Sequence, residues 1–256
     1  MRVLVTRPLR EALDWCARLR ARGVAAEPLP LIDIAPTGAA PMAAAWQGLA
    51  SCHAAMFVSA NAVESFLAAR PQGLAWPAHT AAWATGPGTA RALRQAALPP
   101  AALVTPASDA PQFDSEALWQ LVGHGEALQA LAGARVLIVR GAGEDGRPAG
   151  RPWLAQRLEA AGAQVQELAA YVRRLPVWDA EQRARALGAA DALWLLSSSD
   201  AVRHLQRLLP GADWHGTHAL ATHARIADAA RAAGFGHIAT VRPTLDDVIA
   251  SIESAR

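Results

Sequence analysis

The sequence predicts an α/β protein built from two similar lobes, each a parallel sheet flanked by helices. Short apolar runs, typical of strands buried on both faces, alternate with segments of helical spacing. This alternation is the pattern of right-handed βαβ units. The pattern also repeats, because segments of the chain recur in the same order about 133–139 residues later. Two lobes of the same design follow from that repeat.

Five recurring features define the repeat. Most are apolar runs that continue into Ser, Thr, Gly or Arg just before the next helical segment. The pairs are Val3–Arg7 with Val136–Arg140, Gly23 with Gly162, Phe57–Val63 with Leu195–Val202, Trp83–Gly86 with Leu220–His223, and Val104–Pro106 with Val241–Pro243.

The positions of the individual strands and helices are predicted from the spacing of apolar residues and from the residues that end secondary structure. Strands are expected at residues 2–6, 25–34, 54–58, 80–84, 102–104, 135–139, 164–172, 192–196, 217–221 and 238–241. Helices are expected at residues 9–22, 61–69, 88–96, 114–121, 151–161, 179–187, 199–208, 223–233 and 244–254.

The charge composition excludes several classes of protein. The 24 basic and 22 acidic side chains give a formal net charge of +2, which does not indicate a nucleic-acid-binding surface. All 24 basic residues are arginine. Without lysine the chain cannot form a Schiff base, anchor pyridoxal phosphate or complete a Walker-type phosphate loop.

The cysteines and the apolar runs indicate a cytoplasmic protein. Cys16 and Cys52 are too few for a disulfide framework or a four-ligand zinc site, so we expect them to be buried apolar groups. The apolar run at Val3–Val5 is too short for a signal peptide. No run approaches the 18 apolar residues that predict a membrane span.

Six strand ends carry side chains that suit an anionic ligand: Arg7, Ser59, Thr85, Arg140, Ser197 and Thr222. In parallel α/β sheets, ligands bind beyond the carboxyl ends of the strands, against the N-termini of the following helices. The hydroxyls can also simply cap those helices. With guanidinium and backbone N–H groups beside them, they can instead bind a ligand that has several carboxylates.

The segment Gly141–Gly146 matches the dinucleotide pattern G-x-G-x-x-G. Glu144 and Asp145 would place negative charge where a pyrophosphate binds, and the segment 147–152 delays the next helix. Glu167 also lies near the start of its strand and not at the ribose-facing end. A nucleotide-dependent oxidoreductase is therefore only an alternative interpretation.

Two further residues have both a structural and a functional interpretation. Tyr171, the only tyrosine, lies late in an apolar strand, where it is either a core residue with a satisfied hydroxyl or a hydrogen-bond donor to a ligand. His223 opens a helix directly after Thr222, as a solvated first-turn residue or as a ligand contact. The histidines are not spaced in the sequence as metal ligands are. Ser197–Ser199 lack the G-x-S-x-G pattern of a nucleophile elbow.

These segments together resemble the uroporphyrinogen-III synthase family over essentially the whole chain. The matching stretches are Val3–Pro8, Phe57–Val63, Thr85–Ala90, Val136–Gly141, Gly150–Leu154, Gly162 to Tyr171, Leu196–Val202 and His223–Ala227. The resemblance implies two flavodoxin-like α/β domains joined by a two-strand linker. Residues 1–35 plus 176–256 would form the first domain and 37–172 the second, with linkers at about 27–36 and 167–176.

The resemblance also implies a reaction. The family cyclises the linear tetrapyrrole hydroxymethylbilane to uroporphyrinogen III, with loss of water and inversion of ring D, a lyase step in porphyrin, tetrapyrrole and heme biosynthesis. It uses no cofactor and no metal. The substrate is a small molecule with eight carboxylates, and the enzyme would act as a cytoplasmic monomer without nucleic-acid or membrane partners.

By position in the family, Tyr171 is the residue expected to assist the leaving hydroxyl group. Substrate contacts are expected from the strand ends and helix starts: Arg7, Ser59, Ala60, Asn61, Thr85, Gly86, Thr89, Arg140, Gly141, Arg151, Ser197, Ser198, Ser199, Thr222 and His223. The family's compact arginine turn is stretched here over residues 140–151. Either Arg147 or Arg151 fills the arginine position, and we favour Arg151 because it directly precedes the helix.

A different class of function would fit the same repeat. A non-catalytic two-lobed module that binds a small anion would share the strand-end chemistry, but such modules usually carry a secretion signal. The sequence therefore favours the enzyme over both this module and the nucleotide-dependent oxidoreductase.

Overall fold

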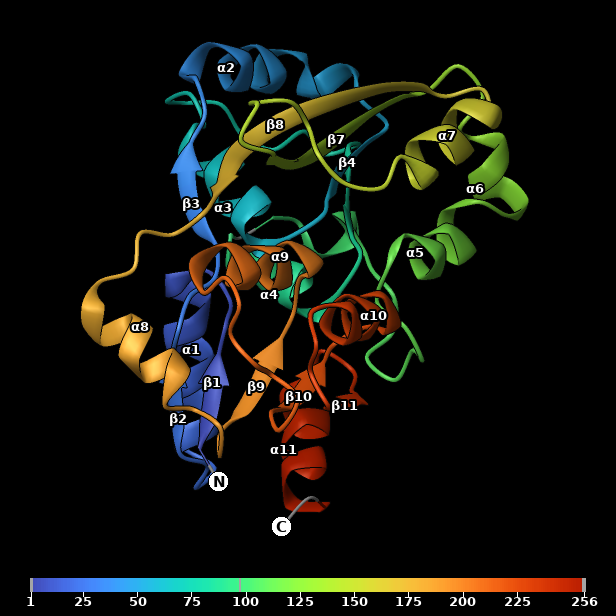
Figure 1. Ribbon diagram of the computed structural model, residues 1–256. Coiled ribbons are helices and arrows are strands. Elements are labelled where there is room, and N and C mark those ends of the chain that lie inside the picture. The colour runs from blue at the N-terminus through green and yellow to red at the C-terminus, as the bar shows by residue number, and fades with distance from the viewer. Residues whose placement is uncertain (1, 97, 255–256) are drawn as a thin grey trace. The chain divides into compact units, whose positions relative to one another are not determined.

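The computed structural model describes residues 2–96 and 98–254 and divides into two compact units (Figure 1). The first unit comprises the chain up to Ile34 and again from Arg174 onward, and the second unit comprises Ala35–Arg173. The second unit is therefore continuous in sequence, whereas the first is assembled from both ends of the chain.

The first unit contains a five-stranded parallel sheet in the order β11-β10-β9-β1-β2. Its strands are β1 (Val3–Val5), β2 (Ala26–Pro28), β9 (Leu193–Leu196), β10 (His218–Ala221) and β11 (His237–Thr240). Numbered within the unit, this order is 2-1-3-4-5, which is the flavodoxin-like arrangement. Figure 1 shows the blue strand β1 beside the orange strand β9, although about 190 residues separate them.

The three inner strands β1, β9 and β10 have buried side chains on both faces, because successive side chains point to opposite sides, whereas the edge strand β11 is mostly exposed. Val3, Val5 and Leu195 pack in one cluster with residues of helices α1 (Leu9–Arg20) and α11 (Leu245–Ser254). Leu4 and Trp194 pack in the other cluster with residues of α8 (Ala180–Leu187), α9 (Ser199–Leu208) and α10 (Ala224–Ala232). The helices thus cover both faces, as the uninterrupted apolar runs predict.

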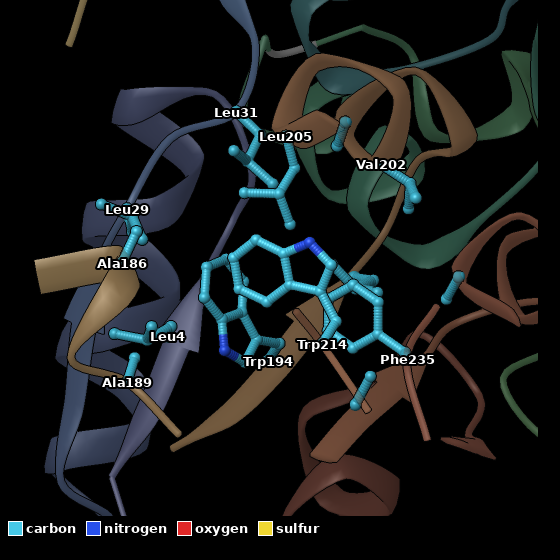
Figure 2. Packing of buried hydrophobic residues seen from close by; sticks show 14 of the residues in the cluster. Leu4, Leu29, Leu31, Ala186, Ala189, Trp194, Val202, Leu205, Trp214 and Phe235 are labelled. Carbon is cyan, nitrogen blue, oxygen red and sulfur yellow. The ribbon is translucent and has the colours of Figure 1, made fainter. Parts of the chain in front are cut away.

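Aromatic side chains fill the centre of the second of these clusters (Figure 2). The rings of Trp214 and Phe235 stack with centroids 5.5 Å apart, and Trp194 meets Trp214 edge-on at 5.3 Å. Leu4, Leu29 and Leu31 belong to the same cluster, so the N-terminal segment completes a core that is otherwise built from the C-terminal third of the chain.

The second unit contains a six-stranded sheet in the order β3-β8-β7-β4-β5-β6. Its strands are β3 (Asp33–Pro36), β4 (Ala54–Phe57), β5 (Ala81–Ala84), β6 (Leu103–Val104), β7 (Arg135–Ala142) and β8 (Gln164–Arg174). The five strands β8-β7-β4-β5-β6 occupy the same order as β2-β1-β9-β10-β11, and β1 corresponds to β7 as the repeat predicts. The two sheets therefore share one design with different starting points in the chain.

Helices flank this sheet too. They are α2 (Ala39–Gly48), α3 (Ala60–Ala68), α4 (Pro87–Gln95), α5 (Ser115–Val122), α6 (Gly125–Gln129) and α7 (Trp153–Ala160), with short 3₁₀ turns at Leu49–Ser51 and Pro100–Ala102. Residues of α5 and α7 pack with Met56, Trp83 and Ile138 in one core cluster. Phe57, from the alternate position on β4, instead meets Phe66 of α3 edge-on.

The predicted α/β class with parallel sheets and flanking helices is confirmed. Three details differ from the expectation. The segment 25–34 forms two strands, β2 and β3, because Pro28 and Pro30 have no N–H to donate to a continuing ladder. Helices α2 and α6 are additional. Helix α2 is rich in alanine on all sides and so lacks the apolar stripe by which helices are found in sequence.

Both thiols are buried, as predicted. Burial raises the pKa of Cys16 to about 11 and also raises the pKa of Cys52, so the reactive thiolate is scarce at neutral pH. We expect native protein at pH 8 to react with an aromatic disulfide reagent about 100-fold more slowly than free cysteine. In urea, both thiols should react at once. Prompt labelling of the native protein would contradict this expectation.

Candidate functional site

The strand order identifies one ligand-binding position in each sheet. In a 2-1-3-4-5 sheet, the connections that leave strands 1 and 3 run toward opposite edges of the sheet. Ligands bind beyond the carboxyl ends of these two strands. This switch point lies at β1/β9 in the first unit and at β7/β4 in the second. Arg7 and Ser197 follow β1 and β9, and Ser59 follows β4, whereas Arg140 lies within β7, which continues to Ala142, and so is not the strand-end residue that was expected.

Tyr171 reaches the switch point of the second unit. It lies near the end of β8 opposite Gly141 of β7, and only 4% of the residue is exposed. A Cβ at position 141 would lie 2.7 Å from the ring, so the phenol occupies space that only glycine leaves open. Its oxygen lies 3.0 Å from Ser59 Oγ, beyond β4. The hydroxyl is hydrogen-bonded, as in the structural interpretation, yet it lies at a strand end.

A β-bulge sets the direction of this side chain. Arg140 pairs with Ala169, but Gly141 pairs with Tyr171, so Ala170 is the extra residue in β8. A shift of one residue moves a side chain to the opposite face of a sheet. The bulge therefore places the Tyr171 ring on the same face as the Gly141 position.

Ser59 begins helix α3. Its Oγ accepts a hydrogen bond of 3.1 Å from the backbone N–H of Ala62, which is an N-cap. Ala60 and Asn61 form the first turn, and Asn61 is buried. Three of the predicted contact residues thus lie in one turn beside the Tyr171 hydroxyl.

The N-terminus of α4 carries another predicted group. Thr85 follows β5, Gly86 is the N-cap and Thr89 is buried in the first turn. No described side chain caps this helix. The N–H groups of Gly88 and Thr89 therefore lie at a positive helix end without a side-chain cap, an arrangement that favours an anion.

Arg140 is engaged with a protein carboxylate. Its Nη1 donates to Glu167 Oε1 at 2.7 Å and its Nη2 donates to the carbonyl of Arg151 at 3.0 Å, with only 7% of the residue exposed. Gly150 leaves room for this guanidinium, since a Cβ there would lie 2.6 Å from Nη2. The sequence does not reveal this partner, because Glu167 lies on the neighbouring strand β8.

The glycine pattern at 141–146 is not a dinucleotide turn. Gly141 and Ala142 belong to β7, and the segment folds back as a hairpin in which Ala149 N–H donates to the Gly141 carbonyl at 2.9 Å. Helix α7 begins only at Trp153. Because a nucleotide fingerprint requires a helix to start at the turn itself, the basis for the oxidoreductase interpretation is lost.

The two candidate arginines of this hairpin have different surroundings. Arg151 forms a bidentate ion pair with Glu116 of α5, at 2.6 and 2.5 Å, and this contact raises the pKa of its guanidinium. Arg147 lies exposed in the turn, where its backbone N–H donates to Asp145 Oδ1. Contrary to the prediction, Arg151 does not directly precede α7, because Pro152 is the N-cap and the helix begins at Trp153.

At the first unit's switch point, Arg7 is also paired within the protein. Its Nη1 lies 3.1 Å from Glu11 Oε2, and its guanidinium lies over the Trp15 ring at 4.8 Å from the centroid. The four-residue spacing of Arg7 and Glu11 is a sequence signal that could have revealed this pair. Arg7 and Arg140, which correspond in the repeat, therefore both have their charge balanced by a nearby glutamate.

The hydroxyls of this unit lie at two helix starts. Ser198 caps α9 by accepting from the Asp200 N–H at 3.1 Å, and Ser199 Oγ donates to the Arg225 carbonyl at 3.4 Å. His223 caps α10, with its Nδ1 accepting from the Arg225 N–H. Ser197 and Thr222, half-buried, precede these caps. Capping is thus a role that Ser198, His223 and Ser59 share.

Residues 2–96 and 98–254 contain neither a candidate metal site nor a membrane-spanning helix. No three His, Cys, Asp or Glu side chains gather there in a way that could hold a metal ion. Within the same ranges, no helix is long and apolar enough to cross a membrane.

The family model for uroporphyrinogen-III synthase HemD matches residues 14–250 of the chain. The chain belongs to the uroporphyrinogen-III synthase family. Enzymes of this family cyclise hydroxymethylbilane, a lyase-type reaction. The family match contains every predicted site residue except Arg7, which precedes it.

Solved structures of uroporphyrinogen III synthases share the fold. A mutant of the Thermus thermophilus enzyme gives a TM-score of 0.59 at 21% identity, covering 100% of this chain and 98% of that chain. The enzyme from Helicobacter pylori gives 0.58 at 14% identity and covers 100% of both chains. A search of curated proteins gave no match.

Proposed function

We propose that this member of the uroporphyrinogen-III synthase family converts hydroxymethylbilane to uroporphyrinogen III, with loss of water and inversion of ring D. The family match over residues 14–250 carries this conclusion. The reaction is redox-neutral: a hydroxyl group leaves, and the freed methylene carbon bonds to the substituted α-carbon of ring D. The methylene bridge from ring C then breaks from that carbon and bonds to the free α-carbon of ring D, which loses its proton. It therefore needs no redox cofactor. We further propose that the enzyme acts as a cytoplasmic monomer.

The test supplies freshly made hydroxymethylbilane to the purified chain and separates the type I and type III isomers by chromatography. Dominant type III product is expected, because unassisted closure gives the uninverted type I isomer. An isomer ratio equal to that of the enzyme-free control would refute the proposal. Turnover without added metal, in the presence of a chelator, is expected to be unchanged.

The proposed catalytic residue is Tyr171. The electron-rich pyrrole expels the hydroxyl group once that oxygen is protonated, which leaves an azafulvene that is attacked through a spiro intermediate. The phenol lies at the switch point of the second unit, near the first turn of α3, which supports a role in donating that proton. Most of the catalysis is proposed to be positioning of a flexible chain, with acid assistance as a smaller contribution.

Substituting Tyr171 with phenylalanine is expected to lower kcat by about 10- to 100-fold, the low end for loss of a general acid, because the leaving group departs easily. The ring keeps its packing over Gly141, so the protein stays folded. Initial rates with hydroxymethylbilane and the isomer ratio measure the effect. Wild-type rate and ratio would exclude the acid role.

Substrate carboxylates are proposed to bind at the helix starts and strand ends, through Ser59, Ala60, Asn61, Thr85, Gly86 and Thr89 in the second unit and Ser197, Ser198, Ser199, Thr222 and His223 in the first. Arg7, Arg140, Gly141 and Arg151 remain proposed contacts. Since binding is spread over many N–H donors, Ser197→Ala is expected to raise KM by about fivefold or less. Complete loss of activity in folded Ser197→Ala protein would contradict distributed binding.

A further inference from the structure

The Ser59 hydroxyl joins the N-terminus of α3 to the Tyr171 phenol. Its oxygen accepts the Ala62 N–H at 3.1 Å and lies 3.0 Å from Tyr171 Oη. A serine hydroxyl has one proton and two lone pairs. The Ala62 N–H uses one lone pair, so the hydroxyl proton can be directed toward the phenol oxygen.

The phenol is held in place for this contact. Tyr171 is 4% exposed, its ring fills the space above Gly141, and the bulge at Ala170 sets the face on which it lies. The distance of 3.0 Å fits a hydrogen bond in either direction while the phenol keeps its proton. Once the phenol has given up that proton, the hydrogen bond between these two oxygens can run only from Ser59 to Tyr171.

We propose that Ser59 is a positioning residue whose hydroxyl donates a hydrogen bond to the Tyr171 oxygen as the phenol transfers its proton to the leaving hydroxyl group. The C–O bond breaks with both electrons on oxygen, and water leaves. The phenolate regains a proton from the pyrrole carbon that is deprotonated after ring closure. Ser59 keeps its own proton throughout. This inference rests on the proposed acid role of Tyr171.

The position of Ser59 at a helix start strengthens such a bond. The N–H of Ala62 belongs to the positive end of α3, and a hydroxyl that accepts from it becomes a better donor. Hydrogen bonds to a charged oxygen are about twice as strong as neutral ones. The hydrogen bond therefore stabilises the ionised phenol more than the neutral phenol. A difference of this sign lowers the barrier to proton transfer.

The sole tyrosine allows a spectroscopic test that does not depend on activity. Tyrosinate absorbs near 295 nm, so an alkaline titration of native protein reports Tyr171 alone. Ser59→Ala is expected to move the tyrosinate midpoint about one pH unit upward, because the ionised form loses a donor. Ser59→Thr, which keeps the hydroxyl, is expected to restore the midpoint. Strands β7 and β8 carry five charged residues, and all stay unchanged in these variants: Arg135, Arg140, Glu167, Arg173 and Arg174.

Kinetics separate this role from capping alone. Ser59→Ala is expected to lower kcat by about five- to tenfold, to raise KM by no more than the roughly fivefold expected for any one substrate contact, and to have no further effect on kcat when Tyr171→Phe is already present. Asp179→Ala, which removes the cap of α8 in the first unit, serves as the matched loss of a cap and should leave kcat unchanged.

The outcomes distinguish the two proposals. An unmoved tyrosinate midpoint in folded Ser59→Ala protein, or an equal loss of kcat with and without Tyr171→Phe, would overturn the role of Ser59. A wild-type rate in Tyr171→Phe together with a shifted midpoint would instead overturn the acid role of Tyr171, and with it the catalytic part of this inference.

Discussion

Replacing Glu167 with glutamine is expected to lower the free energy of unfolding by about 2–3 kcal/mol. Glutamine keeps the shape and an acceptor oxygen but removes the charge that balances Arg140. The arginine side chain is 9% exposed, so it would remain as a buried cation without a counter-ion, whereas Glu167 is partly exposed at 31%. Partial exposure places the expected cost below that of a fully buried pair. Urea denaturation followed by far-UV circular dichroism measures it.

Glu181→Gln is the matched control for this measurement. Glu181 also pairs with an arginine, Arg185, at 2.6 Å, but the glutamate side chain is 80% exposed on α8. Exposed pairs of this kind contribute little, so a change within about 0.5 kcal/mol is expected. If both substitutions cost the same, burial of the Arg140 guanidinium has no energetic consequence and the interpretation is wrong.

Gly236→Ala is expected to destabilise the protein by about 3 kcal/mol or more. A Cβ at this position would lie 1.8 Å from the carbonyl oxygen of His215 and 2.8 Å from its carbonyl carbon. Both are backbone atoms, so the clash cannot be relieved by a rotamer change, and the loops that precede β10 and β11 must move apart. Overpacking typically costs 1–3 kcal/mol where side chains can adjust.

Gly216→Ala tests whether the clash is responsible. Gly216 lies beside His215 in the same loop but has no heavy atom within 4 Å of the Cβ position, and its φ is not in the left-handed region. Alanine there is expected to be neutral or to stabilise by up to about 1 kcal/mol, because it restricts the unfolded chain. Thermal melts of the two variants provide the comparison, and similar melting temperatures would rule out the steric explanation.

The internal repeat made the fold accessible from sequence. Val3–Arg7 and Val136–Arg140 form β1 and β7, which occupy equivalent places in the two sheets. Apolar runs buried on both faces are recognisable because every residue in them is apolar. Helix α2 could not be found in this way, since its alanines give no contrast between faces.

The candidate site was only partly predictable, for a geometric reason. Strand-end hydroxyls such as Ser59 could be placed, because a strand followed by a helix fixes where a cap lies. The contact between Ser59 and Tyr171 joins residues 112 positions apart and depends on the bulge at Ala170, which no local pattern specifies. The Glu167 partner of Arg140 depends on the same strand pairing.

The discontinuity of the first unit has a consequence for biosynthesis. Strand β1 is central in its sheet, yet its neighbour β9 begins at Leu193. At about 5–20 residues per second, the ribosome needs about 10–40 s to supply that partner. The contiguous second unit can fold during this interval, while β1 has β2 but not β9 available to pair with. A nascent chain of this design therefore has an extended period of exposure to chaperones.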